Sequence, residues 1–70
     1  MKYTVILEQG QDGWGAYAPD LPGCAVIAKT EEQAAELIRE AIRLYLDDLR
    51  TKHLPAPQPT SKATEVEILG

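Results

Sequence analysis

Acidic side chains are the residues of this chain that could do hydrolytic chemistry. Metal-dependent nucleases use several carboxylates that converge on two metal ions about 3.5–4 Å apart. The candidates are Glu8 near the N-terminus, Glu36 and Glu40 in a helical segment, and Glu65 and Glu67 near the C-terminus. No aspartate lies in the middle of an expected strand, and Glu36 and Glu40 fall on the helix face that we expect to meet solvent. We therefore predict a protein that is not an enzyme and that needs no metal or other cofactor.

Cys24 and His53 are the other reactive side chains, and each is the only residue of its type. One thiol and one imidazole cannot build a structural zinc site within one chain, and a single cysteine cannot form an internal disulfide. Cys24 opens a short apolar run, which favours a buried structural cysteine over a nucleophile. His53 follows a helix, where a charged imidazole can interact with the last carbonyl groups.

Size and charge point to a protein partner. The chain has 70 residues, with 7 Lys and Arg against 11 Asp and Glu and a net charge of −4, which argues against a phosphate-binding surface. The lone cysteine and the absence of a secretory signal pattern predict a cytoplasmic protein, and the longest apolar run is too short for a membrane span. A domain this small buries a limited core, so we expect a homo-oligomer, a dimer or larger.

Hydrophobic periodicity predicts a single domain over residues 1–70 of the α+β class, with one sheet covered by one helix in the order β-β-β-α-β. Alternating or apolar runs predict strands over residues 2–8, 14–18, 24–29 and 64–69. The third run is nearly all apolar, as in a strand that is central or covered on both faces. Thr30 begins a capping box with Gln33, and the segment from Glu31 to about Arg50 contains no glycine or proline, so it predicts a helix.

The predicted helix has a wide apolar surface. Its apolar arc approaches about 200°, more than the roughly 100° that covers one sheet. Either the sheet curls around the helix or one flank meets a second chain. Leu37 and Leu44 widen the arc on one side and Leu46 on the other, so we predict these three residues at an oligomer interface.

Two loops and one aromatic residue allow alternative interpretations. Residues 19–23 form a stiff corner between strands, or a docking protrusion with Asp20 and an exposed Leu21. Trp14 either closes the core or anchors a partner, as aromatic residues do at binding hot spots. Together with Tyr17, these residues are our predicted partner-binding set. The proline-rich residues 54–59 favour a rigid crossover over a ligand for a proline-recognition domain.

Several motifs at fixed spacing resemble the HicB antitoxin family. The resemblance covers about residues 3–59 and rests on these segments: YAPDLPGC at 17–24, the Thr30-Glu31-Glu32 helix start with Ala34 and Ala35, Glu40-Ala41-Ile42 with Tyr45-Leu46, and Leu54-Pro55 with Pro57. It implies a partial RNase H-like fold, in which a three-stranded antiparallel meander is followed by a helix and a returning strand.

The resemblance also implies the antitoxin half of a toxin–antitoxin system. The family's partner, HicA, is a small basic ribonuclease that cleaves messenger RNA with a histidine, and the antitoxin binds it and occludes that site. Longer members continue into a DNA-binding module, whereas this sequence ends at Gly70, so we expect no direct DNA binding from this chain. The alternative is an orphan homo-oligomeric protein-interaction domain of the same fold without a toxin partner.

Overall fold

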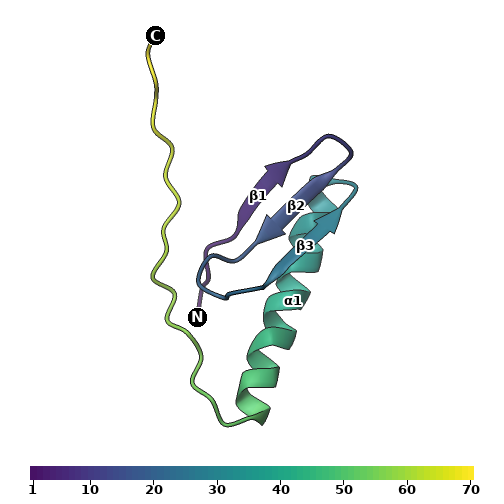
Figure 1. The fold of residues 1–70 in the computed structure, drawn as a ribbon, viewed down its shortest axis with the longest axis vertical. Coiled ribbons are helices and arrows are strands. Elements are labelled where there is room, and N and C mark those ends of the chain that lie inside the picture. Colours follow the sequence, from purple (N-terminus) through teal and green to yellow (C-terminus); the bar gives the residue numbers. More distant parts are fainter.

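A three-stranded antiparallel sheet and one long helix make up the fold, seen in a computed structural model that describes residues 1–70 (Figure 1). Strand order in the sheet is β1-β2-β3, and the helix lies across one face. The elements are β1 (Ile6–Gln9), β2 (Trp14–Tyr17), β3 (Ala25–Ala28) and α1 (Glu31–Thr51). The predicted α+β class and the strand–strand–strand–helix order are confirmed.

Each strand is shorter than its hydrophobic pattern suggested, because each ends where its partner ends. Ile6 pairs with Tyr17, so residues 2–5 extend beyond the last paired residue of β2. Tyr17 in turn pairs with Ala25, after which the Ala18 amide donates to the carbonyl of Cys24 at 3.1 Å and closes the corner. Alternation therefore located the strands correctly, while the neighbouring strand set their length.

The β1–β2 hairpin depends on a glycine at its end. The amide of Gly10 donates to the carbonyl of Gly13 at 2.7 Å and closes the loop. Gly13 also lies against the backbone of Ala28, and a Cβ atom at this position would overlap the carbonyl oxygen of Ala28. The close approach of the hairpin to the end of β3 thus requires glycine at position 13.

Helix α1 has well-defined ends. Thr30 is extended, with φ −126° and ψ 160°, and its hydroxyl accepts the Gln33 amide at 3.1 Å, as the capping box predicts. At the other end the Leu54 amide donates to the Leu49 carbonyl at 2.9 Å. His53 adopts the left-handed conformation there, with φ 57°, in a position that glycine usually occupies.

The core is small and includes the β2–β3 loop. Its fully buried side chains are Ala16, Ala18, Leu21, Cys24, Ala34 and Ile38. Leu21 is only 1% exposed, so the predicted exposure of this side chain is wrong. Backbone bonds from the Leu21 amide to Ala18 and from the Cys24 amide to Leu21, both 3.0 Å, turn the loop inward so that Leu21 fills the gap between sheet and helix.

The predicted fourth strand does not join the sheet. Residues 64–69 are extended and exposed, and they belong to no strand pairing. The returning strand that a partial RNase H-like fold implies is thus not part of this sheet. The physical reason is that alternation specifies a segment able to pair, but not the edge on which it pairs. The preceding residues 55–61, here called the strap, lead back from the helix to the start of the chain, where the Tyr3 hydroxyl donates to the Pro57 carbonyl at 2.6 Å.

Candidate functional site

One face of the sheet has no helix over it. Strand register places Ile6, Tyr17 and Ala25 in one row across this face, and Glu8, Gly15 and Ile27 in the next row. These six residues, here called the outer face, have the opposite strand parity to Ala16 and Ala18, which point into the core. The outer face is therefore a preformed surface on a rigid element.

The outer face carries exposed apolar side chains. Ile27 is 86% exposed, and Tyr17 and Ala25 are exposed beside it. The apolar sequence of β3 had suggested a strand that is central or covered on both faces, but β3 is an edge strand with one uncovered face. A cluster of exposed apolar side chains on a rigid sheet is typical of a protein-interaction surface.

An acidic hollow borders the outer face at the hairpin end. Its volume is about 450 Å³, and its lining includes Glu8, Asp12, Trp14, Gly15 and Ile27. Because Gly15 has no side chain, the outer face is recessed at its centre, between Glu8 and Ile27. No basic side chain lines the hollow, and neither acid takes part in an ion pair. The hollow is suited to a cationic side chain presented next to an apolar one.

The structure separates the predicted partner-binding residues. Tyr17 lies on the outer face, and Trp14 lines the acidic hollow while it also packs against the core. Leu21 is buried and therefore unavailable to a partner. Ile27 and Glu8 share the outer face with Tyr17, and the two-residue period of the strands is the sequence signal that identifies them.

Asp20 holds the strap. Its carboxylate accepts the Ser61 amide at 2.9 Å and the Ser61 hydroxyl at 2.7 Å, and the Thr60 hydroxyl donates to it at 3.2 Å. The Ser61 hydroxyl and amide hydrogen bonds stabilise the charged form and lower the pKa of Asp20. Thr4 donates to the carbonyl of Ser61 at 2.7 Å, so the strap is fixed at Ser61 from two sides.

The predicted oligomer residues also lie on different surfaces. Leu37 and Leu44 are exposed on one flank of α1, whereas Leu46 lies on the opposite flank, where it packs against the core and lines a groove beside β1. The wide apolar arc therefore serves three surfaces: the core and two flanks. A role for these residues in an oligomer stays a prediction.

Charged residues on α1 pair with one another. Arg43 bonds Glu40 and lies 3.6 Å from Asp47, Arg50 also bonds Asp47, and Lys52 lies 2.9 Å from Asp48. The Arg43 hydrogen bond lowers the pKa of Glu40. Such exposed pairs each contribute little to stability. They agree with the predicted solvent-facing side of the helix.

The reactive side chains lie on separate parts of the fold. No group of three or more His, Cys, Asp or Glu side chains comes close enough to hold a metal ion. Cys24 is buried as predicted, and burial raises the pKa of its thiol. His53 is exposed at the end of α1, and its amide donates to the Arg50 carbonyl at 3.0 Å. The helix is also too polar for a membrane-crossing segment.

These features define a small α+β domain with exposed apolar side chains on the uncovered face of its sheet. Comparison with known families finds a match over residues 3–67 to the HicB-like antitoxin of bacterial toxin–antitoxin systems. The chain belongs to this HicB-like antitoxin family.

Relatives of similar length support this membership. A UPF0150 protein of Thermoplasma acidophilum is 37% identical over 67 residues, which is 94% of this chain and 97% of the relative. A UPF0150 protein of Synechocystis is 44% identical over 68 residues, 96% of this chain and 86% of the relative. A third, from Helicobacter pylori, is 39% identical over 54 residues, 77% of this chain and 75% of the relative.

Proposed function

We propose that this chain is an antitoxin domain that binds a small basic ribonuclease of the HicA type and occludes its RNA site. The observation that carries the proposal is the outer face, where exposed apolar side chains lie next to two unpaired acids. Family membership and the net charge of −4 support the same conclusion. An RNA-cleaving enzyme presents cations to the phosphate backbone, and an acidic inhibitor can compete for them.

Tyr17 and Ile27 supply the apolar contacts of the proposed interface. Both lie on the sheet, so little side-chain or loop entropy is lost when a partner covers them. Glu8 and Asp12 border the same surface and receive a cationic side chain of the partner in the acidic hollow. Trp14 supports the hollow from the core side. This division of roles makes affinity depend mainly on Ile27 and Tyr17, and association rate and salt dependence mainly on the acids.

Co-expression with a small basic protein encoded beside the gene of this chain tests the proposed function. We expect relief of growth arrest, a complex on gel filtration, and loss of messenger-RNA cleavage when the purified proteins are mixed. Association should weaken as salt concentration rises, because exposed charges are screened. Persistent toxicity without a complex would show that this chain is not the antitoxin of that protein.

A second candidate function is favoured by the exposed Leu37 and Leu44 on α1. In this alternative the chain is an orphan homo-oligomeric interaction domain with no toxin partner. The absence of a small basic gene beside its own, together with a stable oligomer that Leu37→Asp disrupts, would favour this alternative. In either case we propose that the protein acts in the cytoplasm, where a free buried cysteine stays reduced.

A further inference from the structure

The C-terminal residues 64–69, here called the arm, form a strand-like segment without a partner. Val66 is 74% exposed and Ile68 is 82% exposed, and they alternate with Glu65 and Glu67. Figure 1 shows the yellow end of the chain running beyond the sheet and away from the helix. An extended segment with one apolar and one acidic face has the pattern of a strand that covers a hydrophobic surface.

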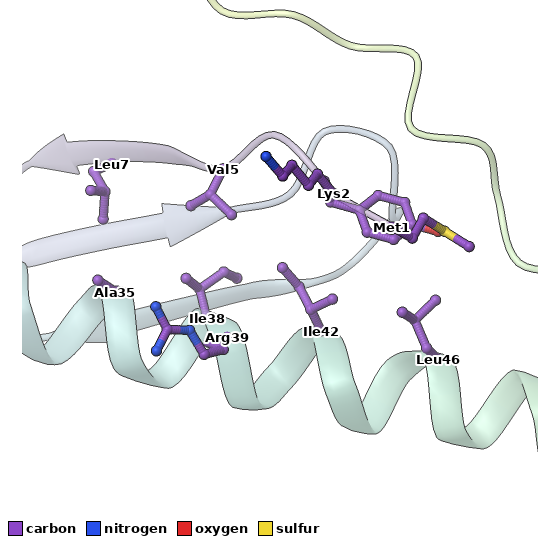
Figure 2. Close-up of a pocket in the computed structure, with 10 residues that line it drawn as sticks. Met1, Lys2, Val5, Leu7, Ala35, Ile38, Arg39, Ile42 and Leu46 are labelled. Carbon is purple, nitrogen blue, oxygen red and sulfur yellow. The ribbon is translucent and has the colours of Figure 1, made fainter.

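A groove beside β1 offers such a surface. β1 has β2 as its single neighbour, so its other edge is free. Figure 2 shows side chains of the N-terminal segment and of one flank of α1 facing each other across the groove. Its volume is about 580 Å³, and its lining is largely apolar, with Val5, Leu7, Ile38, Ile42 and Leu46 among the contributors. A strand added to the free edge of β1 would cover this groove with alternate side chains.

The charges of arm and groove are complementary. The charged residues that line the groove, Lys2 and Arg39, are both cationic. Those of the arm, Glu65 and Glu67, are both anionic. The one acid of β1, Glu8, lies near the opposite end of the strand from Lys2. Glu65 and Glu67 point away from the groove when Val66 and Ile68 enter it, so these charges act at longer range and favour the approach of an acidic strand over a basic one.

Both parts lie on the same chain but do not meet within it. The strap is fixed at Ser61 by Asp20 and Thr4, and the arm that follows leaves the body of the molecule although the β1 edge is free. The chain measures 49 Å along its longest axis against 26 Å and 17 Å along the others. One protruding arm and one empty groove on each copy allow a reciprocal exchange, which closes at two chains.

We propose that the arm of one copy adds as a fourth strand to the free edge of β1 in a second copy. Val66 and Ile68 then enter the partner's groove, and the two exchanges form a closed dimer. The exchange also protects two exposed strand edges from uncontrolled pairing. This proposal does not depend on a toxin, because the outer face remains free in the dimer.

The mass of the full chain in solution is the first test. Light scattering after gel filtration at micromolar concentration should give a dimer. The double substitution Val66→Asp with Ile68→Asp removes the apolar face of the arm, so we expect the dimer dissociation constant to rise by roughly a hundred-fold or more. Both residues lie outside the core, so the circular-dichroism spectrum should not change. Leu44→Asp tests the rival oligomer surface on the exposed flank of α1, and it should leave a dimer that forms by arm exchange intact.

Cross-linking between two batches of protein is the second test. One batch carries Leu7→Cys in the groove, and the other carries Ile68→Cys in the arm and a different affinity tag. A short bis-maleimide, which tolerates a register offset, should give a covalent dimer that contains both tags. Wild-type protein gives the background, because Cys24 is buried.

Four outcomes would overturn the proposal. These are a monomeric wild-type chain, a dimer that survives the arm substitutions, a dimer that Leu44→Asp dissociates, and an internal cross-link in a monomer that carries both new cysteines. The last outcome would place the arm on the β1 edge of its own chain. If the wild-type chain is monomeric on its own and its arm binds only another protein, the proposal is also overturned, because the wild-type chain is then a monomer.

Discussion

The Asp20 carboxylate and Ser61 are joined by two hydrogen bonds, 2.9 Å from the Ser61 amide and 2.7 Å from its hydroxyl, across 41 positions of sequence. This contact ties the strap to the β2–β3 loop. It therefore sets the point from which the arm departs, so the position of the arm depends on the loop of residues 19–23, whose sequence fits both a stiff corner and a docking protrusion.

Asp20→Asn should release the strap. The substitution removes the charge that strengthens both Ser61 contacts, so the Ser61 amide should exchange faster and trypsin should cleave sooner after Lys62. Asp12→Asn is the control, because Asp12 makes no ion pair or side-chain hydrogen bond. Equal tryptic cleavage in wild type and Asp20→Asn would contradict the role of this contact.

The strap should also respond to pH. The hydrogen bonds hold the pKa of Asp20 below its ordinary value in the folded chain. The contact is therefore fully present above the ordinary carboxyl range, about pH 4, and is lost as pH falls through the lower folded pKa. Amide exchange at Ser61 should show protection that is stable from pH 7 to 5 and declines in more acidic solution, after correction for the intrinsic exchange rate. Protection that declines between pH 7 and 5 would point to another group.

Leu21→Ala should destabilise the fold strongly. Leu21 is a large, 1% exposed side chain, and its truncation leaves a cavity in a core of six buried residues. We expect a loss of about 2–5 kcal/mol in the free energy of unfolding, measured by urea denaturation. Leu44→Ala, at an exposed position, should change it by about 0.5 kcal/mol or less. Similar losses for both variants would show that the loop does not close the core.

Two hairpin glycines should respond differently to alanine. At Gly13 a Cβ would overlap the carbonyl oxygen of Ala28, whereas at Gly10 the nearest atom is the Gly13 carbonyl oxygen at 3.6 Å, an ordinary contact. Gly13→Ala should cost roughly 1–3 kcal/mol, because backbone must move to make room. Gly10→Ala should be close to neutral. Thermal denaturation of both variants measures the difference, and a larger loss at Gly10 would contradict the close approach of hairpin and β3.

Local sequence signals predicted the meander and the helix well. The alternation of residues 2–8, the turn-forming residues 19–23 and the Thr30 capping box depend on neighbours in sequence, so the helix lies where these signals place it and each strand overlaps its predicted run. The burial of Cys24 followed from its apolar surroundings. Contacts between distant segments could not be predicted in the same way.

The wrong predictions share one physical cause. The proline- and glycine-rich residues 19–23 indicate a turn, but which way Leu21 points depends on the space that α1 leaves above the sheet. The apolar sequence of β3 fits a covered strand as well as an edge strand with an interaction face. Nothing in the spacing of Asp20 and Ser61 signals their contact. In each case the outcome depends on a contact with a segment that is distant in sequence. Periodicity describes only one segment at a time.

Binding of the chain to the basic protein encoded beside it, measured by calorimetry for wild type and Ile27→Asp, tests the central claim most directly. Leu44→Asp is the matched control on the helix, and circular dichroism checks that all three proteins are folded. We expect wild type and Leu44→Asp to bind equally, and Ile27→Asp to bind roughly thirty-fold or more weakly, because a charge replaces an apolar contact of about 2 kcal/mol or more. Equal affinity of Ile27→Asp and wild type would contradict the assignment of the outer face, and no binding by any of the three would contradict the antitoxin function itself.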